Sequence, residues 1–573
     1  MRLVTNSIIT NIFPAYEKNP LFDRYRYLDD NLEKALLQVV ETEGSILTPM
    51  WLSRASYMIL SLKISEELRK DPNLKKYPEM LQESELAYVL ARIFGVKNIR
   101  LSYFHDSTLL GLYVSSSLNK GLLPVIYGMN NVAPQDQKNL EGVYLVNEQD
   151  IKKLIYLFCT KPTIKYIDEV YNQLTLIAPT VYVTNDPNRI LLKNGIYDRR
   201  LKQVLSFDPS YIALTKIPVN YVENAKNPII SMPDGKQWDV DSWIDDLFED
   251  PEISCLMWQV FADVLQPNIS RNKAIWFYSE SGNNGKGTIG QLIKNLVGPA
   301  NFASLAVDDF SREFALDTLI GKAVNIADEN DVNVYIDSVK NYKASITGDT
   351  LFVNRKYEKP IGLVFTGTNI QMMNGLPKTR DKSGSFYRRI IPVPFVKSFT
   401  NNGERPYIKN EYIKRQDVLE YVLWKAIQLR FNEFIEPKAS RLLLESYKES
   451  NDSVVQFWNE FSHEFQWDGL PSQFLFDLYM AWFKRNNPFG KAVNKSNFLD
   501  SLRNLLINDH NWESRIESSQ SFRSSPRMDA DEPLITEYQL VNWYNKQCLS
   551  GVDELKRRFP RKQVYRGIIR KVH

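Results

Sequence analysis

The chain has 573 residues, which is enough for several domains that each bury a hydrophobic core. A hydrophobic content of 43%, a charged content of 24% and a net charge of +3 are those of an ordinary soluble protein, so any surface for nucleic acid must be a local patch. Three isolated cysteines argue against a disulfide framework or a zinc site, and the absence of a long apolar run or a signal peptide predicts a cytoplasmic protein without a membrane segment.

Residues 1–165 are predicted to form a mainly helical domain, because apolar side chains recur there at helical spacing, for example over residues 86–93. A primase centre would need paired carboxylates on strands to hold catalytic metal ions. Asp29 and Asp30, beside a helix start, and Asp106, after a lone histidine, instead favour helix-cap and surface roles. The sequence therefore assigns no task to this domain.

A connecting region of short strands is predicted over residues 166–240, where Asn194-Gly195 supplies a turn signal between apolar runs. The next predicted domain spans residues 241–400. It opens with an amphipathic helical region from Trp243 to Val264, which leads to a predicted strand at residues 274–278.

A glycine-rich loop, Glu280-Ser-Gly-Asn-Asn-Gly-Lys-Gly-Thr288, joins this strand to a predicted helix. Such a loop places backbone N–H groups and a helix N-terminus around a polyphosphate, which the lysine can reach. Glu280 and Gly287 depart from the strict pattern G-x-x-x-x-G-K-[ST], and an ordinary glycine-rich connection is the alternative. The residues predicted to bind phosphate are Ser281, Gly282, Asn283, Asn284, Gly285, Lys286, Gly287 and Thr288.

A second apolar strand, residues 323–327, ends in Asp328-Glu329. In nucleotide hydrolysis the first acid of such a pair typically holds Mg2+, and the second can orient the attacking water. An Asp-Glu pair is common at strand ends, but after a glycine-rich loop it predicts the acidic part of an ATP site.

Two further elements complete this pattern. The segment Leu363–Asn369 is predicted to be a buried strand with a polar tip, so that Asn369 can hydrogen-bond a γ-phosphate or water. Arg388 and Arg389 precede another apolar strand. Paired arginines are usually surface residues, but here an arginine that completes a neighbouring subunit's site is favoured, because its planar fork spreads positive charge over a transferring phosphoryl group.

Basic and aromatic residues alternate in a predicted hairpin over residues 352–360. Arg355, Lys356 and Tyr357 have the chemistry to grip phosphates and stack on bases of DNA. A solvated hairpin tip is the alternative.

Residues 401–450 are predicted to be a helical linker, and residues 451–573 a C-terminal domain with aromatic-rich helices. The polar stretch 517–533 is predicted to be a mobile loop, with a disordered insertion as the alternative. The chain ends in a basic segment without acids, which predicts phosphate contacts unless it is a solvated tail. The residues predicted to contact DNA there are Arg561, Lys562 and Arg566.

The order of these motifs resembles superfamily 3 helicases of the AAA+ class, and within them the phage and poxvirus DNA-dependent NTPases known as primase-helicases. It is also similar to the replication initiator (Rep) helicases of staphylococcal pathogenicity islands and phages. The segments that carry the resemblance most strongly are 280–288, Asp328-Glu329, Thr347-Gly-Asp349, Thr368-Asn369, Leu376-Pro377 and Arg388-Arg389. Weaker resemblance covers the rest of the chain from about residue 186 onwards.

The resemblance implies an α/β fold in which a AAA+ P-loop motor domain lies between the mainly helical N-terminal domain and a C-terminal winged-helix domain. It implies an ATP-dependent DNA helicase and replication initiator of a mobile genetic element or phage. Such a protein would form a ring, in the form of a homohexamer, with ATP and Mg2+ between subunits, one DNA strand in the channel and origin duplex on the C-terminal domain.

The resemblance also implies roles for single residues. Lys286 would hold the β- and γ-phosphates, Thr288 and Asp328 would hold Mg2+, and Glu329 would position water. Asn369 would sense the γ-phosphate, and Arg388 or Arg389 would act in a neighbouring site.

Two other functions stay open. One is a DNA-binding initiator whose ATP site serves only as an assembly switch. The other is a nucleotide kinase, because the string Gly285-Lys-Gly-Thr288 also resembles adenylate-kinase loops. Gly287 stands where a Mg2+-binding hydroxyl is usual, so that ligand would come from Thr288 or water.

Overall fold

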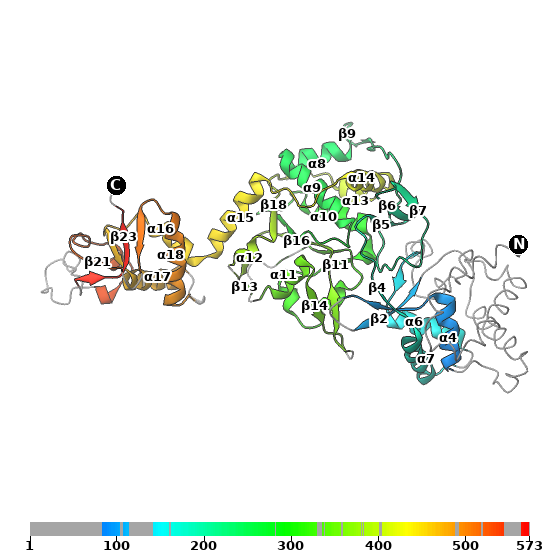
Figure 1. The fold of residues 1–573 in the computed structure, drawn as a ribbon. Helices are drawn as coiled ribbons and strands as arrows, with labels where there is room; N and C mark the ends of the chain where they lie inside the picture. The colour runs from blue at the N-terminus through cyan, green and yellow to red at the C-terminus, as the bar shows by residue number, and fades with distance from the viewer. Residues whose placement is uncertain are drawn as a thin grey trace, which may run out of the picture. The chain divides into compact units, whose positions relative to one another are not determined.

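The computed structural model describes residues 83–102, 107–113, 141–159, 162–280, 282–328, 330, 335–336, 338–356, 359–379, 381, 383–399, 404–486, 492–516, 520–543 and 563–571. The chain divides into two compact units, residues 1–441 and 442–573 (Figure 1). Among the described residues, no helix combines the length and the apolarity that crossing a bilayer requires.

The first unit begins with a mixed four-stranded sheet in the order β3-β2-β1-β4. Strand β1 pairs antiparallel with β2 and parallel with β4, and β3 pairs antiparallel with β2. The elements are α4 (Glu83–Phe94), β1 (Lys97–Arg100), β2 (Thr108–Tyr113), β3 (Tyr144–Leu145), α6 (Glu148–Phe158), α7 (Ile164–Ile177) and β4 (Thr180–Tyr182).

The helix predicted over residues 86–93 is confirmed as α4, but the prediction of a mainly helical domain missed this sheet. The predicted boundary at residue 165 falls inside α7, and β4 extends the layer to Tyr182. Strand β1, with the sequence Lys-Asn-Ile-Arg, is too short to show a clear alternation of polar and apolar residues. Asp29, Asp30 and Asp106 lie outside the described residues.

The connecting region forms a three-stranded antiparallel sheet and a separate two-stranded pair. Strands β5 and β6 form a tight hairpin, which confirms the turn predicted at Asn194-Gly195. The strands are β5 (Arg189–Leu192), β6 (Gly195–Asp198), β7 (Gln203–Leu205), β8 (Ile230–Ser231) and β9 (Gln237–Trp238).

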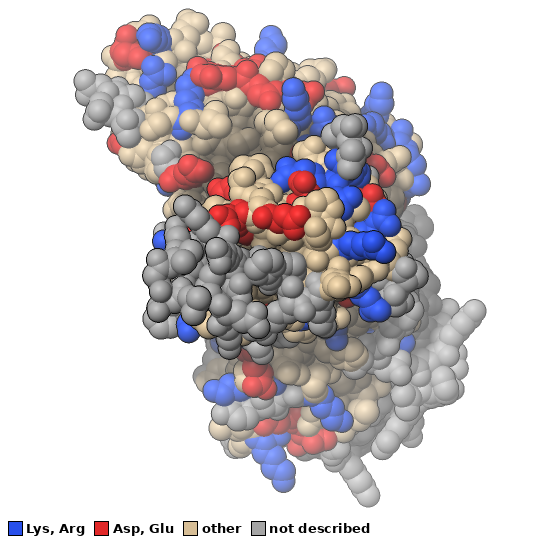
Figure 2. All heavy atoms as spheres, turned by 90° about the vertical axis from the view of Figure 1, so that its left-hand side faces the viewer, with Lys and Arg blue, Asp and Glu red and all other residues tan. Residues whose placement is uncertain are grey.

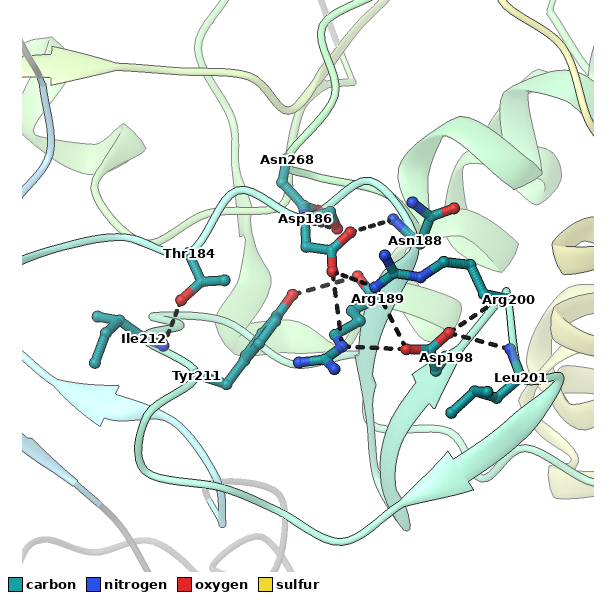
Figure 3. A network of polar contacts seen from close by, with 10 residues as sticks. All are labelled: Thr184, Asp186, Asn188, Arg189, Asp198, Arg200, Leu201, Tyr211, Ile212 and Asn268. Carbon is teal, nitrogen blue, oxygen red and sulfur yellow. Dashed lines mark hydrogen bonds and ion pairs between the residues drawn. The ribbon is translucent and has the colours of Figure 1, made fainter.

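A network of ion pairs and hydrogen bonds fastens this hairpin (Figure 3). Arg189 Nε lies 3.2 Å from Asp198 Oδ2, and Arg200 Nη2 lies 3.0 Å from Asp186 Oδ2. Asn268 Nδ2 donates to the backbone oxygen of Asp186 at 3.0 Å, so the network also reaches the chain just before the next sheet.

The centre of the first unit is a five-stranded parallel sheet in the order β11-β12-β16-β10-β18. Its strands are β10 (Ala274–Tyr278), β11 (Phe302–Ala303), β12 (Val324–Ala327), β16 (Thr368–Met373) and β18 (Ile390–Pro394). The strands predicted at 274–278 and 323–327 are therefore confirmed, and the fold is α/β around a parallel sheet. Because the strands are parallel, their carboxyl ends share one edge, which is the edge where open α/β sheets bind ligands.

Helices cover both faces of this sheet (Figure 1). Ile275 and Phe277 of β10 enter the core shared with α8 (Val240–Phe248), α9 (Pro251–Val264), α10 (Lys286–Val297) and α14 (Gln416–Gln428). Trp276 belongs to the other face, where its indole N–H donates to Tyr342 Oη of α11 (Lys340–Thr347) at 2.8 Å and its ring meets Phe386 of α12 (Gly384–Tyr387). Strands buried on both faces read as continuous apolar runs, which explains why β10 was easily recognised.

The helical region predicted from Trp243 to Val264 is two helices rather than one. Glu249 ends α8 in a left-handed conformation with a φ of 57°. Asp250 then caps α9 by accepting a hydrogen bond from the backbone N–H of Glu252, and Pro251 occupies the first turn. Proline fits a first turn but cannot extend a preceding helix, so the chain has to restart there.

The hairpin predicted over residues 352–360 is confirmed, because β14 (Thr350–Val353) pairs antiparallel with β15 (Ile361–Val364). The linker predicted over 401–450 is helical, with α13 (Pro406–Asn410), α14 and α15 (Lys438–Asn451). The remaining short elements of the first unit are β13 (Tyr335–Ile336), β17 (Lys378–Thr379) and the 3-10 helices η5 (Pro299–Asn301), η6 (Asp308–Ser311), η7 (Ala315–Leu319) and η8 (Tyr412–Lys414).

In the second unit, helices pack on a three-stranded antiparallel sheet in the order β19-β23-β20. Strands β21 and β22 form a separate antiparallel pair. Ring contacts of Phe457 with Tyr479, Trp482 and Phe498 lie in its core, so the predicted aromatic-rich helices are confirmed. The elements are α16 (Ser453–Phe461), β19 (Gly469–Pro471), α17 (Ser472–Asn486), α18 (Lys495–Leu505), η9 (Leu506–Asn508), β20 (Trp512–Arg515), β21 (Phe522–Arg523), α19 (Leu534–Glu537), η10 (Val541–Trp543), β22 (Val564–Tyr565) and β23 (Gly567–Arg570).

The mobile loop predicted over residues 517–533 is wrong for its described part, residues 520–533. Met528 and Glu532 are fully buried there. Glu532 Oε2 accepts hydrogen bonds from the backbone N–H groups of Gln466 and Trp467, at 2.9 and 3.1 Å. The segment is therefore packed through a few buried side chains, and the carboxylate of Glu532 serves internal hydrogen bonds, while other polar residues such as Arg523 and Asp529 are exposed.

Candidate nucleotide-binding site

A braced loop joins β10 to α10 at the carboxyl edge of the parallel sheet. The buried side chain of Asn284 braces it, because Nδ2 donates to Ser279 Oγ at 2.5 Å and Oδ1 accepts from the backbone N–H of Lys286 at 3.1 Å. Gly285 has a φ of 83°, and a Cβ there would lie 2.6 Å from Leu247 Cδ1. Only glycine satisfies both the conformation and the space at this position.

The two departures from the strict loop pattern have different consequences. Glu280 does not adopt a positive φ, and its carboxylate accepts a hydrogen bond from Tyr278 Oη at 3.0 Å, so the entry to the loop does not require glycine. Gly287 lies in the first turn of α10 and offers no side chain to a metal ion. The next hydroxyl is that of Thr288, which is half-buried in the same turn. Ser281 lies outside the described residues.

The amine of Lys286 lies at the end of the neighbouring strand. Its Nζ donates to the backbone oxygen of Met373 at 2.7 Å and to Asn374 Oδ1 at 2.6 Å. The residue is only 8% exposed, and this burial lowers the pKa of its amine to about 8. The predicted lysine therefore lies at the carboxyl edge, held by the strand between β10 and β12.

Asp328 follows β12 at the same edge and is exposed. Its carboxylate forms an ion pair with Lys294 of α10. Glu329 lies outside the described residues. Among the residues that are described, no group of three or more His, Cys, Asp or Glu side chains could hold a metal ion alone. One carboxylate and one hydroxyl nevertheless suit Mg2+, which commonly takes one or two carboxylates and completes its shell with phosphates and water.

The predicted strand end at Asn369 is wrong. Strand β16 starts at Thr368, and Asn369 pairs in register with Ala274 at the amino edge of the sheet. Asn369 is buried, and its Nδ2 donates to the backbone oxygen of Ser345 at 3.3 Å. Asn374, directly after β16, is the asparagine that meets Lys286. The missed signal was a second polar tip, Asn374-Gly375, at the end of the apolar run that continues past Asn369.

Arg388 and Arg389 directly precede β18, so they lie at the amino edge, away from the loop of their own chain. Arg389 donates through Nη1 to the backbone oxygen of Ser385. Arg388 is exposed, and among the described residues its guanidinium makes no hydrogen bond or ion pair. The backbone oxygen of Arg388 accepts from Lys273 Nζ at 2.6 Å, and the same amine lies 2.5 Å from Glu436 Oε1. The two arginines therefore differ: Arg389 is hydrogen-bonded to its own chain, and Arg388 is exposed.

The residues predicted to bind DNA lie in two places. Arg355, in the loop between β14 and β15, forms an ion pair with Asp317 at 3.2 Å, and Lys356 beside it is exposed. Arg566 is exposed between β22 and β23. Figure 2 shows lysine and arginine interspersed with acidic side chains, so no field of one sign covers that face. Tyr357, Arg561 and Lys562 lie outside the described residues.

A cavity of 180 Å3 lies elsewhere in the first unit, beside the amino edge of the parallel sheet. Its lining includes basic side chains that are bonded within the chain: Lys216 Nζ donates to the backbone oxygen of Glu141 at 2.5 Å, and Lys322 Nζ to that of Ala300 at 2.6 Å. This cavity is separate from the phosphate loop, and we place no part of the nucleotide site there.

Two segments match known protein families. Residues 277–389, from β10 to the arginine pair, match a family described as "Family of unknown function (DUF5906)". Residues 449–538 of the second unit match a family described as "Poxvirus D5 protein-like". No curated protein matches the chain.

Among solved structures, those of the NrS-1 C-terminal region align with this chain. One such structure has 12% sequence identity and a TM-score of 0.41, and the overlap covers 86% of this chain and 100% of the other. A second, also of the NrS-1 C-terminal region, has 15% identity and a TM-score of 0.37 over 64% and 76% of the two chains. The JCV helicase overlaps at 13% identity with a TM-score of 0.23, over 39% and 63%. These scores are low, and the overlaps support no functional assignment.

Proposed function

We propose that the chain is an ATP-dependent DNA helicase of the superfamily 3 type that initiates replication of a mobile genetic element or phage. The observation that carries this proposal is the position of Lys286. Its amine reaches from the glycine-rich loop to Asn374 at the end of β16, and Asp328 follows the next strand at the same sheet edge.

The loop binds the polyphosphate of ATP through its backbone N–H groups and the N-terminus of α10. Lys286 donates to Met373 and Asn374 in this structure, and those bonds are exchanged for β- and γ-phosphate oxygens when nucleotide binds. Asn374, rather than Asn369, then contacts the γ-phosphate or the attacking water. Thr288 and Asp328 would hold Mg2+, and the bound ion would supply charge neutralisation for the transferring phosphoryl group. Glu329 keeps its proposed role of orienting water.

Arg388, the exposed arginine of the pair, completes the site of a neighbouring subunit. Arg388 lies at the amino edge of the sheet and Lys286 at the carboxyl edge, so Arg388 cannot serve its own loop. A ring of identical subunits, which we propose to be a homohexamer, would bring the amino edge of one sheet to the carboxyl edge of the next. Arginine is suited to this role because its fork stabilises charge on a transferring phosphoryl group.

DNA contacts are assigned to both units. The hairpin with Arg355 and Lys356 would follow one strand in the channel of the ring. In the second unit, α16, β19, α17 and α18 precede β20, and β23 follows α19 in the chain to complete the antiparallel sheet β19-β23-β20. This arrangement supports a winged-helix domain. Arg566 and the basic segment before it would then bind phosphates of origin duplex.

The test compares the wild-type chain with Lys286→Ala in ATP hydrolysis and in strand displacement on forked DNA. We expect the variant to retain its fold, by circular dichroism, and to lose both activities. ATP hydrolysis that survives the substitution would overturn the assignment of the loop. Hydrolysis by the wild type without strand displacement would replace the helicase with an assembly switch.

A further inference from the structure

A second lysine lies over the start of α10. A Cβ built on Gly287 would lie 3.6 Å from Lys409 Nζ, and apart from its chain neighbours and the backbone of α10 no other described atom lies within 4 Å of it. Gly282, at the crest of the same loop, has nothing within 4 Å of such a Cβ. The space above the loop is therefore open except for the ammonium group of Lys409, which comes from α13.

The segment that carries Lys409 is fastened to both ends of α10. At the loop end, the backbone N–H of Phe399 donates to the backbone oxygen of Asn283 at 2.7 Å, and Asn283 Nδ2 donates to Glu404 Oε1 at 2.5 Å. Towards the other end, Asn295 Nδ2 donates to the backbone oxygen of Ile413 at 3.0 Å. Lys409 lies between these anchors, so its approach to Gly287 follows from the packing of the segment.

No acid in the described part of the chain neutralises Lys409. Its side chain is exposed and takes part in no ion pair or hydrogen bond among those residues. Glu404, in the same segment, is engaged by Asn283, and Asp328 is engaged by Lys294. A cation at a helix N-terminus is opposed by the helix dipole, and Lys286 adds a second positive charge nearby. An anion between the two lysines would remove this repulsion.

We propose that Lys409 is a second cationic contact for the phosphates of the nucleotide bound at the loop of its own chain. This inference rests on the proposed function and adds a binding residue to it. It also explains why glycine suits position 287, because a larger side chain there would extend into the space between the loop and the Lys409 ammonium group. The alternative is a solvated surface lysine that passes near the loop without touching the ligand.

The experiment measures binding of a fluorescent ATP analogue to the full chain without Mg2+, so that neither hydrolysis nor the metal ion contributes. Lys409→Gln is compared with Lys414→Gln, which changes an exposed lysine of the same segment that is not found beside Gly287. We expect Lys409→Gln to weaken binding about tenfold, Lys409→Arg to retain most of it and Lys414→Gln to leave it unchanged. Binding of adenosine, which has no phosphate, should be unaffected by all three.

Equal affinities of Lys409→Gln and Lys414→Gln, with wild-type binding intact and lost in Lys286→Ala, would overturn the role of Lys409 and leave the proposed function standing. A loss that is equally large for adenosine would also overturn it, because the effect would then come from folding. If the wild-type chain binds no ATP, both the proposed function and this inference fail.

Discussion

The two edges of the parallel sheet differ in how their charged groups are satisfied. At the carboxyl edge, Lys286 is bonded to Asn374 and Asp328 is paired with Lys294. At the amino edge, Arg388 is exposed, and its guanidinium has no partner among the described residues. Lys286 and Asp328 thus have partners within their own chain, while Arg388 at the other edge is a cation for which the described residues offer no anion. The difference supports a proposed ATP site that is shared between two copies of the chain.

The largest expected effect tests that sharing. We predict that Arg388→Ala lowers ATP turnover about a thousandfold, because an arginine that stabilises the transferring phosphoryl group is worth at least this much. Arg389→Ala should have a much smaller effect, since Arg389 is bonded to its own chain at Ser385. Turnover by purified variants measures both.

A mixing experiment sharpens the same point. Subunits with Arg388→Ala, combined with Lys286→Ala subunits, should regain part of the activity, because some interfaces then pair an intact loop with an intact arginine. Mixed rings that show no gain would mean that Arg388 does not act between subunits.

The next largest effect compares the two ends of β16. We predict that Asn374→Ala lowers turnover about a hundredfold, as removal of one preorganised donor does, and changes the free energy of unfolding by less than about 0.5 kcal/mol. Asn369→Ala should instead lower that free energy by about 1–3 kcal/mol, because the buried amide of Asn325 and the backbone oxygen of Ser345 would each lose a hydrogen-bond partner. Urea denaturation measures the loss of stability, and ATP turnover measures the loss of activity. Lost turnover in Asn369→Ala with full turnover in Asn374→Ala would return the catalytic role to Asn369.

The smallest effect concerns pH. Burial lowers the pKa of Lys286 to about 8, and a bound polyphosphate would favour the charged amine and raise the pKa again. Binding therefore takes up a proton as the pH rises through 8, and affinity for ATP should fall about tenfold between pH 7 and pH 9. Lys286→Arg stays charged over this range, so it serves as a control for titration of the nucleotide. Parallel pH profiles of the two proteins would exclude Lys286 as the titrating group.

The two strands that lead to the loop and to Asp328, β10 and β12, could be predicted because each is one apolar run with a polar end. The strand of Asn369 could not, because residues 361–373 form two strands in different sheets, β15 and β16. The break lies at Gly367, where a Cβ would come 2.4 Å from the backbone oxygen of Ala323. A glycine inside an apparent strand marks such a close approach, but the pattern alone does not show which side of it joins the sheet.

Other features needed contacts between distant segments. The sheet order, which puts β16 between β10 and β12, brings Asn374 to Lys286 across a sequence separation of 88 residues, and no local pattern encodes that pairing. The sequence also does not show which of Arg388 and Arg389 acts in a neighbouring site, and only their different surroundings in the structure distinguish them. The predicted helix of α10 needed no such information, since its apolar spacing already fixed the face that packs on the sheet.

The amine of Lys273 connects the amino edge of the parallel sheet with the start of α15. It is the common donor to the backbone of Arg388 and to Glu436, two positions before α15 begins. Helix α15 spans the division between the two units at Arg441. If Arg388 binds the nucleotide of a neighbouring subunit, as proposed, a displacement of Arg388 would either move the start of α15 as well or break one of these two hydrogen bonds. The chain thus contains a short connection, through one lysine, between the amino edge of the sheet and the start of α15.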